Sequence, residues 1–160
     1  ATTAAQDGVP PDSLPISAAA MTDWARGALG MRASRFVDHS GLSGLSRVTA
    51  RDMVAALLAL GPEGPLTPVL REVPLTDDSG APEPLRLRAK TGTLNFVSAL
   101  PGYIRPVRGR DLAFAILTDA PVRRAAVAPD DREAPAGTAA WSRRSREMQF
   151  DLCRIWGGVV

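Results

Sequence analysis

Four consecutive residues, Lys90-Thr91-Gly92-Thr93, carry the clearest chemistry in this sequence. Lys90 is the only lysine among 19 basic residues, and it offers a positive charge. Thr91 adds a hydroxyl and Thr93 a backbone N–H, so the segment holds the groups needed to bind a carboxylate and to stabilise a developing oxyanion. Gly92 lets a ligand approach the backbone closely, because it has no side chain. A Lys-Thr-Gly tripeptide is short, however, and a plain surface strand end would carry it equally well.

The residues around this tetrapeptide predict three strands. Leu85–Lys90 alternates apolar and polar positions, as a half-buried strand does. A second strand is expected over Ser98–Arg105, where Pro101-Gly102 suggests a bulge or broken pairing. A turn at residues 108–110 then leads into a third strand, Leu112–Leu117. Both faces of this third strand are apolar, which predicts that it is covered on both sides.

Three helices complete the expected domain. They run from a Ser17 cap to Leu29, from a Thr49 cap to Leu60, and over residues 138–156. Helical spacing places Trp24, Leu58 and Met148 on the buried stripes. The proline-rich segments 61–84 and 119–137 are expected to be connections, with one helical turn at 67–71. The order of elements predicts an α+β fold in which an antiparallel sheet is flanked by helices.

A second segment, Asp38-His39-Ser40-Gly41-Leu42-Ser43, precedes Arg47-Val48-Thr49 at a helix start. Followed by the Lys-Thr-Gly segment, this order resembles the C-terminal half of the class C low-molecular-mass penicillin-binding proteins. Those proteins are serine D-alanyl-D-alanine carboxypeptidases and endopeptidases, and their pattern is Asp-Gly-Ser-Gly-Leu-Ser, Arg-Val-Thr and Lys-Thr-Gly. Residues 100–104 and 112–117 also look like the strands that follow in that family. His39, Gly44 and Pro101 depart from the common Gly, Arg and Ala.

The resemblance implies the C-terminal part of a penicillin-recognising serine transpeptidase or β-lactamase-like domain that forms an acyl-enzyme and binds β-lactams. It implies that Lys90 supports proton transfer, that the Thr91 hydroxyl binds the substrate carboxylate next to Gly92, and that the Thr93 N–H completes the oxyanion hole. It also implies a cleft border formed by Asp38, Ser40, Gly41, Leu42 and Ser43, with Leu42 against the D-Ala side chain. No metal or cofactor is implied.

The nucleophile that the family uses is not in this chain. The family pattern needs a Ser-x-x-Lys and a Ser-x-Asn, yet Lys90 is the only lysine and Asn95, the only asparagine, follows Thr93-Leu94. We therefore expect residues 1–160 to be the C-terminal part of one catalytic domain whose partner is the upstream half of the same protein. By itself the chain should be inactive. The intact enzyme would act on peptidoglycan peptides in the periplasm or another extracytoplasmic space.

The family topology also predicts the edges of the sheet. The strand over 112–118 should have an open edge that upstream strands fill, and the strand ending at Lys90 should form the opposite edge. An unpaired apolar edge favours aggregation, so we expect the segment to be structured only when the upstream chain accompanies it.

Composition and single residues leave a few alternatives open. A non-catalytic binding domain could hold anionic ligands with Lys90, Arg86 and Arg88 on one strand face. Nucleic-acid binding by an arginine-rich hairpin at residues 105–110 is disfavoured, because no aromatic residues are interleaved and the net charge is only +2. The single Cys153 excludes an internal disulfide and a cysteine-based zinc site, and it is expected to be a packed thiol.

The single histidine, His39, excludes a two-histidine metal site. It stands beside Asp38, as a base with an orienting acid would, but we expect an ordinary loop residue. No apolar run is long enough to span a membrane, and no signal peptide is recognisable at the start of the chain.

Overall fold

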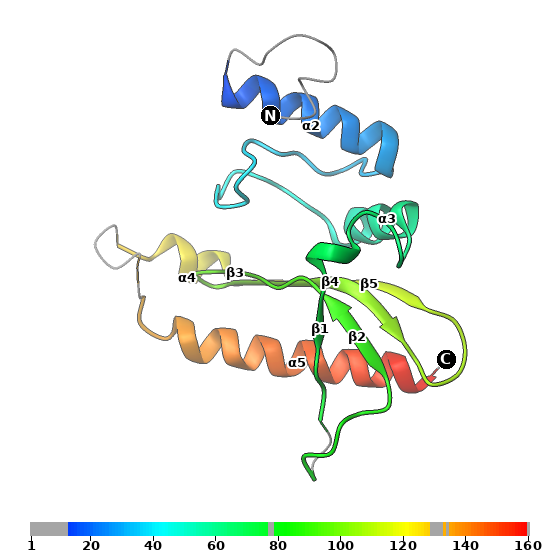
Figure 1. Cartoon of the computed structure of the whole chain (residues 1–160). Coiled ribbons are helices and arrows are strands. Elements are labelled where there is room, and N and C mark those ends of the chain that lie inside the picture. Colours follow the sequence, from blue (N-terminus) through cyan, green and yellow to red (C-terminus); the bar gives the residue numbers. More distant parts are fainter. Residues whose placement is uncertain (1–12, 77–78, 129–132, 134, 160) are drawn as a thin grey trace. The chain divides into compact units, whose positions relative to one another are not determined.

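A computed structural model describes residues 13–76, 79–128, 133 and 135–159. The chain divides into two compact units, Ala1–Gly61 and Pro62–Val160. The first unit contains α2 (Leu14–Leu29) and α3 (Ala50–Leu60), joined by a long loop (Figure 1). The second contains an antiparallel sheet with a long helix, as the sequence predicts. No helix in the described part of the chain is long and apolar enough to cross a membrane.

Helix α2 begins earlier than the sequence analysis expects. Ser13, not Ser17, is its N-cap, and its hydroxyl accepts a hydrogen bond from the N–H of Ile16. Pro15 in the first turn fits this start, since a helix can begin with proline. Ser17 instead lies inside the helix and is buried. The predicted ends at Gly30 and Gly61 and the predicted Thr49 cap of α3 are confirmed.

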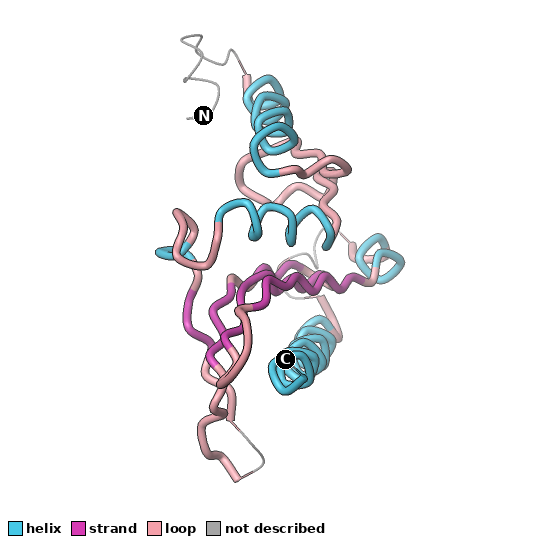
Figure 2. The backbone as a smooth tube through the Cα atoms, turned by 90° about the vertical axis from the view of Figure 1, so that its right-hand side faces the viewer, coloured by secondary structure: helices cyan, strands magenta, loops and turns pink. Residues whose placement is uncertain are grey.

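The second unit is built around the sheet, with α5 (Thr138–Val159) running along one face (Figure 2). The other elements, in chain order, are η1 (Thr67–Val69), β1 (Arg71–Val73), β2 (Arg86–Ala89), β3 (Gly92–Leu94), β4 (Val97–Arg105), β5 (Leu112–Asp119) and α4 (Pro121–Ala125). Strand β1 and helix α4 lie in the two segments expected to be connections. Strand β1 has three residues and helix α4 has five, so neither is long enough to show a periodicity.

The predicted buried stripe is displaced on α2 and is only partly right on α3 and α5, where Leu57 is 3% exposed and Leu152 and Trp156 pack against the core. Trp24 is 46% exposed, Leu58 69% and Met148 41%. Besides Leu57, many of the buried helix positions carry small or polar side chains, namely Ala18 and Ala25 of α2, Asp52 and Ala56 of α3, and Ser142, Ser145 and Gln149 of α5. Small residues let the helices approach their neighbours closely. A prediction based on the spacing of large apolar residues does not detect such positions. Cys153 is fully buried in the core, as expected.

Strands β2 and β3 pair with the same edge of β4 in one unbroken register. Ala89 lies opposite Gly102, and Gly92 lies opposite Ala99. The two short strands are therefore parts of one strand, and the bulge expected at Pro101-Gly102 is absent. Gly102 is required where the strands come together, because a Cβ at this position would lie 2.2 Å from the carbonyl oxygen of Arg88.

The edges of the sheet differ in part from the expectation. Strand β5 pairs with β4 along its whole length and, among the described residues, with nothing beyond it, so its predicted open edge is confirmed. The expected opposite edge is wrong for β2, because β1 pairs with residues 87–89 from the outside. Only the continuation past Ala89, which includes β3, lies at the edge. Leu117 on β5 is 38% exposed, so that strand is not fully covered on both faces.

Candidate active site

Strand β2, residues 90–91 and strand β3 form one outer strand beside β4. The segment from Lys90 to Thr93 lies where this outer strand passes the end of β1. The N–H of Lys90 donates to the carbonyl of Pro101 on β4 at 3.0 Å. Backbone groups of an antiparallel strand point alternately to its two neighbours, so Lys90 and Gly92 face β4 while Thr91 and Thr93 face outward. Among the described residues no strand pairs with β3 on that side. The N–H and C=O groups of both threonines are therefore directed to an open sheet edge.

Pro101 explains why the outer strand is interrupted at this point. In a continuous ladder residue 101 would donate its N–H to the carbonyl of Lys90, but proline has no N–H. The reciprocal bond from the Lys90 N–H is present. The expected broken pairing is thus confirmed as one missing hydrogen bond, opposite Lys90, with no change of register.

The side chains of the segment are exposed. Lys90 shares the strand face of Arg86 and Arg88, and its Nζ donates to the carbonyl of Thr91 at 2.7 Å. Thr91 and Thr93 lie on the opposite face, in line with the buried Ala89. Because Gly92 carries no side chain between them, a ligand can reach the backbone edge. The arrangement can hold an anion between one cation and outward N–H groups.

The turn after β3 is held firmly. Phe96 adopts a positive φ of 56°, which is unusual for a bulky residue. Its carbonyl accepts from the N–H of Ala120, and its ring packs edge-on against Trp141 with centroids 6.1 Å apart. These contacts offset the backbone strain and fix the end of β3 close to Thr93.

The loop after α2 is organised around the carboxylate of Asp38. Its oxygens accept from the hydroxyl of Ser40, from the N–H of Ser43 at 3.2 Å and from the hydroxyl of Ser46 at 3.1 Å. These hydrogen bonds, that from Ser40 first, hold the pKa of Asp38 below its usual value. Gly41 adopts a φ of 71° at the turn of the loop. The carboxylate is therefore occupied with shaping the loop.

The outer side of this loop presents an apolar side chain. Leu42 is 67% exposed, and its N–H is fixed by the Ser40 hydroxyl at 3.1 Å. The Ser43 hydroxyl is itself used inside the loop, where it accepts from the N–H of Leu45. Of the predicted residues in this loop, Leu42 has the exposure that a contact to a substrate side chain needs.

His39 has a partner that sequence analysis missed. Its Nε2 lies 2.7 Å from the hydroxyl of Ser17 on α2. Ser17 is 2% exposed, so it is not accessible as a nucleophile, and the pair fastens the loop to the helix. The hydrogen bonds of Asp38 go to the serines of the loop and not to His39. The expectation that His39 is a loop residue agrees with this arrangement.

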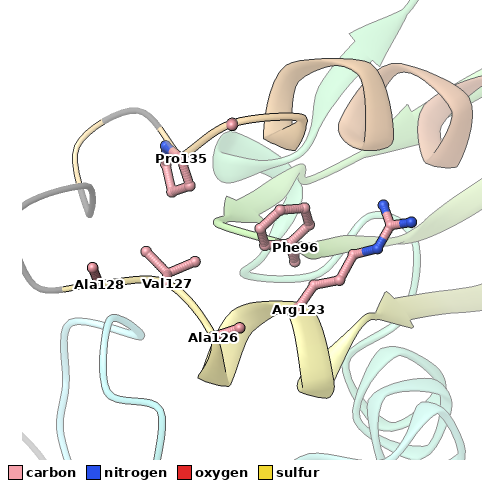
Figure 3. A pocket seen from close by; sticks show the side chains of 7 residues that line it. Phe96, Arg123, Ala126, Val127, Ala128 and Pro135 are labelled. Atoms are coloured by element: carbon pink, nitrogen blue, oxygen red, sulfur yellow. The ribbon is translucent and has the colours of Figure 1, made fainter.

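A cavity of about 330 Å³ lies beyond the β3–β4 turn (Figure 3). Its lining consists of Phe96, Arg123, Ala126, Val127, Ala128, Pro135 and Ala136. Figure 3 shows Phe96, Val127 and Pro135 around the hollow, while the guanidinium of Arg123 extends past the ring of Phe96. No side chain in this lining is a nucleophile or a carboxylate, so the cavity itself does not carry the chemistry.

The sequence profile of the D-Ala-D-Ala carboxypeptidase 3 (S13) family matches residues 13–142, which include both the loop and the Lys90 segment. The chain belongs to this family. A carboxypeptidase from Mycobacterium tuberculosis is 37% identical over 97 residues, which cover 52% of this chain and 21% of that protein. The chain thus spans about a fifth of the length of this relative. No solved structure matches the chain.

Membership of the S13 peptidases agrees with the peptidase predicted from the motifs. The motifs do not account for the fully buried Gln149 of α5, which lies outside the matched residues 13–142. The only signal for Gln149 in the sequence is a polar residue four positions before Cys153 on a helix face that should be apolar. Within the described part of the chain, no group of histidine, cysteine, aspartate and glutamate could hold a metal ion.

Proposed function

We propose that this chain is the substrate-holding part of a serine-type D-Ala-D-Ala carboxypeptidase that acts on peptidoglycan stem peptides outside the cytoplasm. The observation that carries the proposal is the outward direction of the Thr91 and Thr93 backbone groups next to the only lysine of the chain. The family match and the carboxypeptidase relative support the peptidase class. The class C penicillin-binding proteins that the motifs resemble suggest the serine mechanism.

In this mechanism a serine outside the chain attacks the carbonyl of the penultimate D-Ala. A bond forms from its oxygen to the carbonyl carbon, the peptide C–N bond breaks, and the terminal D-Ala leaves with a proton on its nitrogen. Water then hydrolyses the acyl-enzyme. Lys90 stabilises negative charge and supports the proton transfer, while the Thr93 N–H donates to the oxyanion. The Thr91 hydroxyl binds the terminal carboxylate beside Gly92.

Within the first unit, the proposed substrate contact lies on the loop after α2. Leu42 contacts the methyl group of D-Ala, and Gly41 keeps the loop turned so that Leu42 projects from it. Asp38, Ser40 and Ser43 act through the shape of the loop, since their polar groups bond to one another.

The test is covalent labelling with a fluorescent penicillin. The full-length protein should form one adduct per molecule, and the isolated 160-residue chain should form none, because it lacks a Ser-x-x-Lys. A stoichiometric adduct on the isolated chain would overturn the placement of the nucleophile. Absence of any adduct on full-length protein that still binds an acyl-D-Ala ligand would favour the non-catalytic binding domain.

A second arm examines Thr91. Thr91→Val removes the hydroxyl at nearly equal volume, so turnover of a peptide with a free terminal carboxylate should fall about tenfold, the loss of a charge-assisted hydrogen bond. A substrate whose carboxylate is amidated should be affected much less. Equal losses on both substrates would assign Thr91 a structural role only.

A further inference from the structure

The face of the sheet that packs on α5 is built from rows of side chains that cross the strands. Three rows carry apolar residues: Leu87, Ile104 and Leu112; Ala89, Gly102 and Phe114; and Leu100 and Ile116, a row that ends in Thr91 at the open edge. The fourth row consists of Thr93, Ser98 and Thr118. The row that is polar on every strand therefore contains Thr93, one of the two residues whose N–H points to the open edge.

Helix α5 places polar side chains over this row. Gln149 is 1% exposed, and its Nε2 donates to the Ser98 hydroxyl at 3.1 Å and lies 3.4 Å from the Ser98 carbonyl oxygen. The Thr118 hydroxyl donates to the same carbonyl at 3.1 Å and is hydrogen-bonded to the hydroxyl of Ser145. Ser98 is thus held through both its side chain and its carbonyl.

Stability alone does not account for this cluster. An amide and several hydroxyls lose hydration when they are buried, and their hydrogen bonds do little more than compensate for that loss. An apolar row would pack at least as well, as the three neighbouring rows do. What a satisfied polar network adds is a single defined arrangement.

The position of Ser98 shows that the polar network holds strand β3 in place. Strand β3 has three residues and is attached to β4 through Gly92 opposite Ala99 and Leu94 opposite Val97. Ser98 lies between those two partners, directly opposite Thr93. A displacement of Ser98 along β4 therefore moves the whole of β3 with it.

We propose that Gln149 is a positioning residue that acts through Ser98 to set the place of the Thr93 N–H. This inference rests on the proposed function. An oxyanion donor must lie about 2.7–3.1 Å from the charge that develops, and a shift of about 1 Å can cost two orders of magnitude in rate. Loss of Gln149 therefore slows acylation more than it weakens the binding of unreacted substrate.

The test compares Gln149→Leu and Ser98→Ala with wild type in the full-length protein. Each variant should lower the rate constant of acylation by a penicillin about tenfold, while the dissociation constant of the noncovalent complex stays within about twofold. The double variant should lose no more than either single one, because both act through the same contact. Amide exchange over residues 92–97 should become faster in each variant.

Ile116→Val is the matched control, because it removes one methylene from the neighbouring apolar row. It should lower the melting temperature without changing the acylation rate constant. Acylation at the wild-type rate in Gln149→Leu, or a loss that lies entirely in the dissociation constant, would overturn the proposal. If Gln149→Leu does not fold, the same criteria apply to Ser98→Ala, which removes a single buried hydroxyl.

The two proposals can fail separately. If the wild-type protein forms no acyl-enzyme, the proposed function is wrong. If, in addition, amide exchange over residues 92–97 is unchanged in Gln149→Leu and Ser98→Ala, the positioning role of Gln149 is wrong as well. Wild-type acylation that depends on Lys90 but not on Gln149 would leave the proposed function standing and overturn this inference alone.

Discussion

The two candidate segments obtain their shape in different ways. The loop from Asp38 to Ser46 is shaped by side chains, since one carboxylate gathers the hydroxyls of two serines and a backbone N–H. The segment from Lys90 to Leu94 is shaped by the backbone, through its register with β4 and the close approach at Gly102. The loop should therefore respond to pH and to the loss of one carboxylate, whereas the strand should respond to changes in backbone and volume.

The largest effect on the strand segment is expected from Gly102→Ala. The added Cβ would lie 2.2 Å from the Arg88 carbonyl oxygen and 2.8 Å from the Cα of Ala89, and neither backbone atom can move freely. Overpacking of this kind costs about 3 kcal/mol, which should lower the melting temperature of a unit of this size by more than about 10 °C. Calorimetry of the full-length protein measures this change in melting temperature.

Gly92→Ala is the matched control for Gly102→Ala. Its Cβ would lie 3.4 Å from the Cβ of Ala99, an ordinary contact. The variant should keep its stability and lose ligand binding at the edge, because the new methyl group occupies the space that a ligand backbone needs. Equal destabilisation by the two substitutions would contradict the close approach assigned to Gly102.

The next effect concerns chemistry and not folding. Lys90→Ala in the full-length protein should lower the acylation rate constant about 100-fold, which is the usual cost of losing one electrostatic stabiliser of the transition state. Its melting temperature should hardly change, because Lys90 is exposed. Stopped-flow measurement with a penicillin gives the rate constant.

Arg86→Ala serves as the control, because it removes an exposed cation from the same strand face outside the open edge. Acylation should be unaffected by that change. Similar losses in Lys90→Ala and Arg86→Ala would mean that the face binds anions by its overall charge, as the non-catalytic alternative requires.

The loop should show its dependence on a carboxylate as the pH is lowered. Hydrogen bonds hold the pKa of Asp38 below its usual value, so the unfolded or open loop binds a proton before the native loop does. The stabilisation is complete above the unfolded pKa of about 3.9 and is lost as the pH falls through the native pKa. Amide exchange over residues 38–46, corrected for intrinsic rates, should therefore accelerate in acid.

Asp38→Asn should show fast exchange in this loop at neutral pH and little further change in acid. Asp23→Asn removes an exposed carboxylate from α2 and should leave the loop unchanged. If acid loosens wild type and Asp38→Asn by the same factor, another group controls the loop.

The sequence predicts most of the second unit because its signals are local. Alternation locates the three longer strands, and the turn chemistry at Gly109, which adopts a φ of 101°, places the hairpin. Strand β1 has only three residues and pairs with residues 87–89, so its own sequence does not indicate the pairing. The expected sheet edge is wrong at β2 for that reason alone.

For the candidate site, the sequence suggests residues but not their geometry. Motifs identify Lys90 and Thr93, while the outward direction of the Thr93 N–H follows from the register with β4. The contact between Gln149 and Ser98 cannot be predicted from the sequence, because the two residues lie 51 positions apart in the chain. The partnership of Ser17 and His39 likewise depends on how the loop folds back onto α2.

The smallest effect should come from Pro101→Ala, which tests why the outer strand is interrupted. The new N–H can donate to the Lys90 carbonyl, and a hydrogen bond of this kind contributes about 1 kcal/mol. Loss of the ring costs a similar amount, because the unfolded chain gains freedom and a buried apolar contact is lost. The net change in the free energy of unfolding should therefore be less than about 1 kcal/mol.

The informative measurement on Pro101→Ala concerns the hydrogen bonds between β4 and the outer strand. The new amide at position 101 should exchange slowly, and the outer strand should run without a break through Lys90 and Thr91. Because the register is already continuous on both sides, Thr93 should keep its place and the acylation rate constant should change less than about twofold. An unprotected amide at position 101 would show that something other than the missing N–H separates β2 from β3. The strand segment would then not be shaped by its backbone alone, and it would no longer contrast with the loop, which is shaped by side chains.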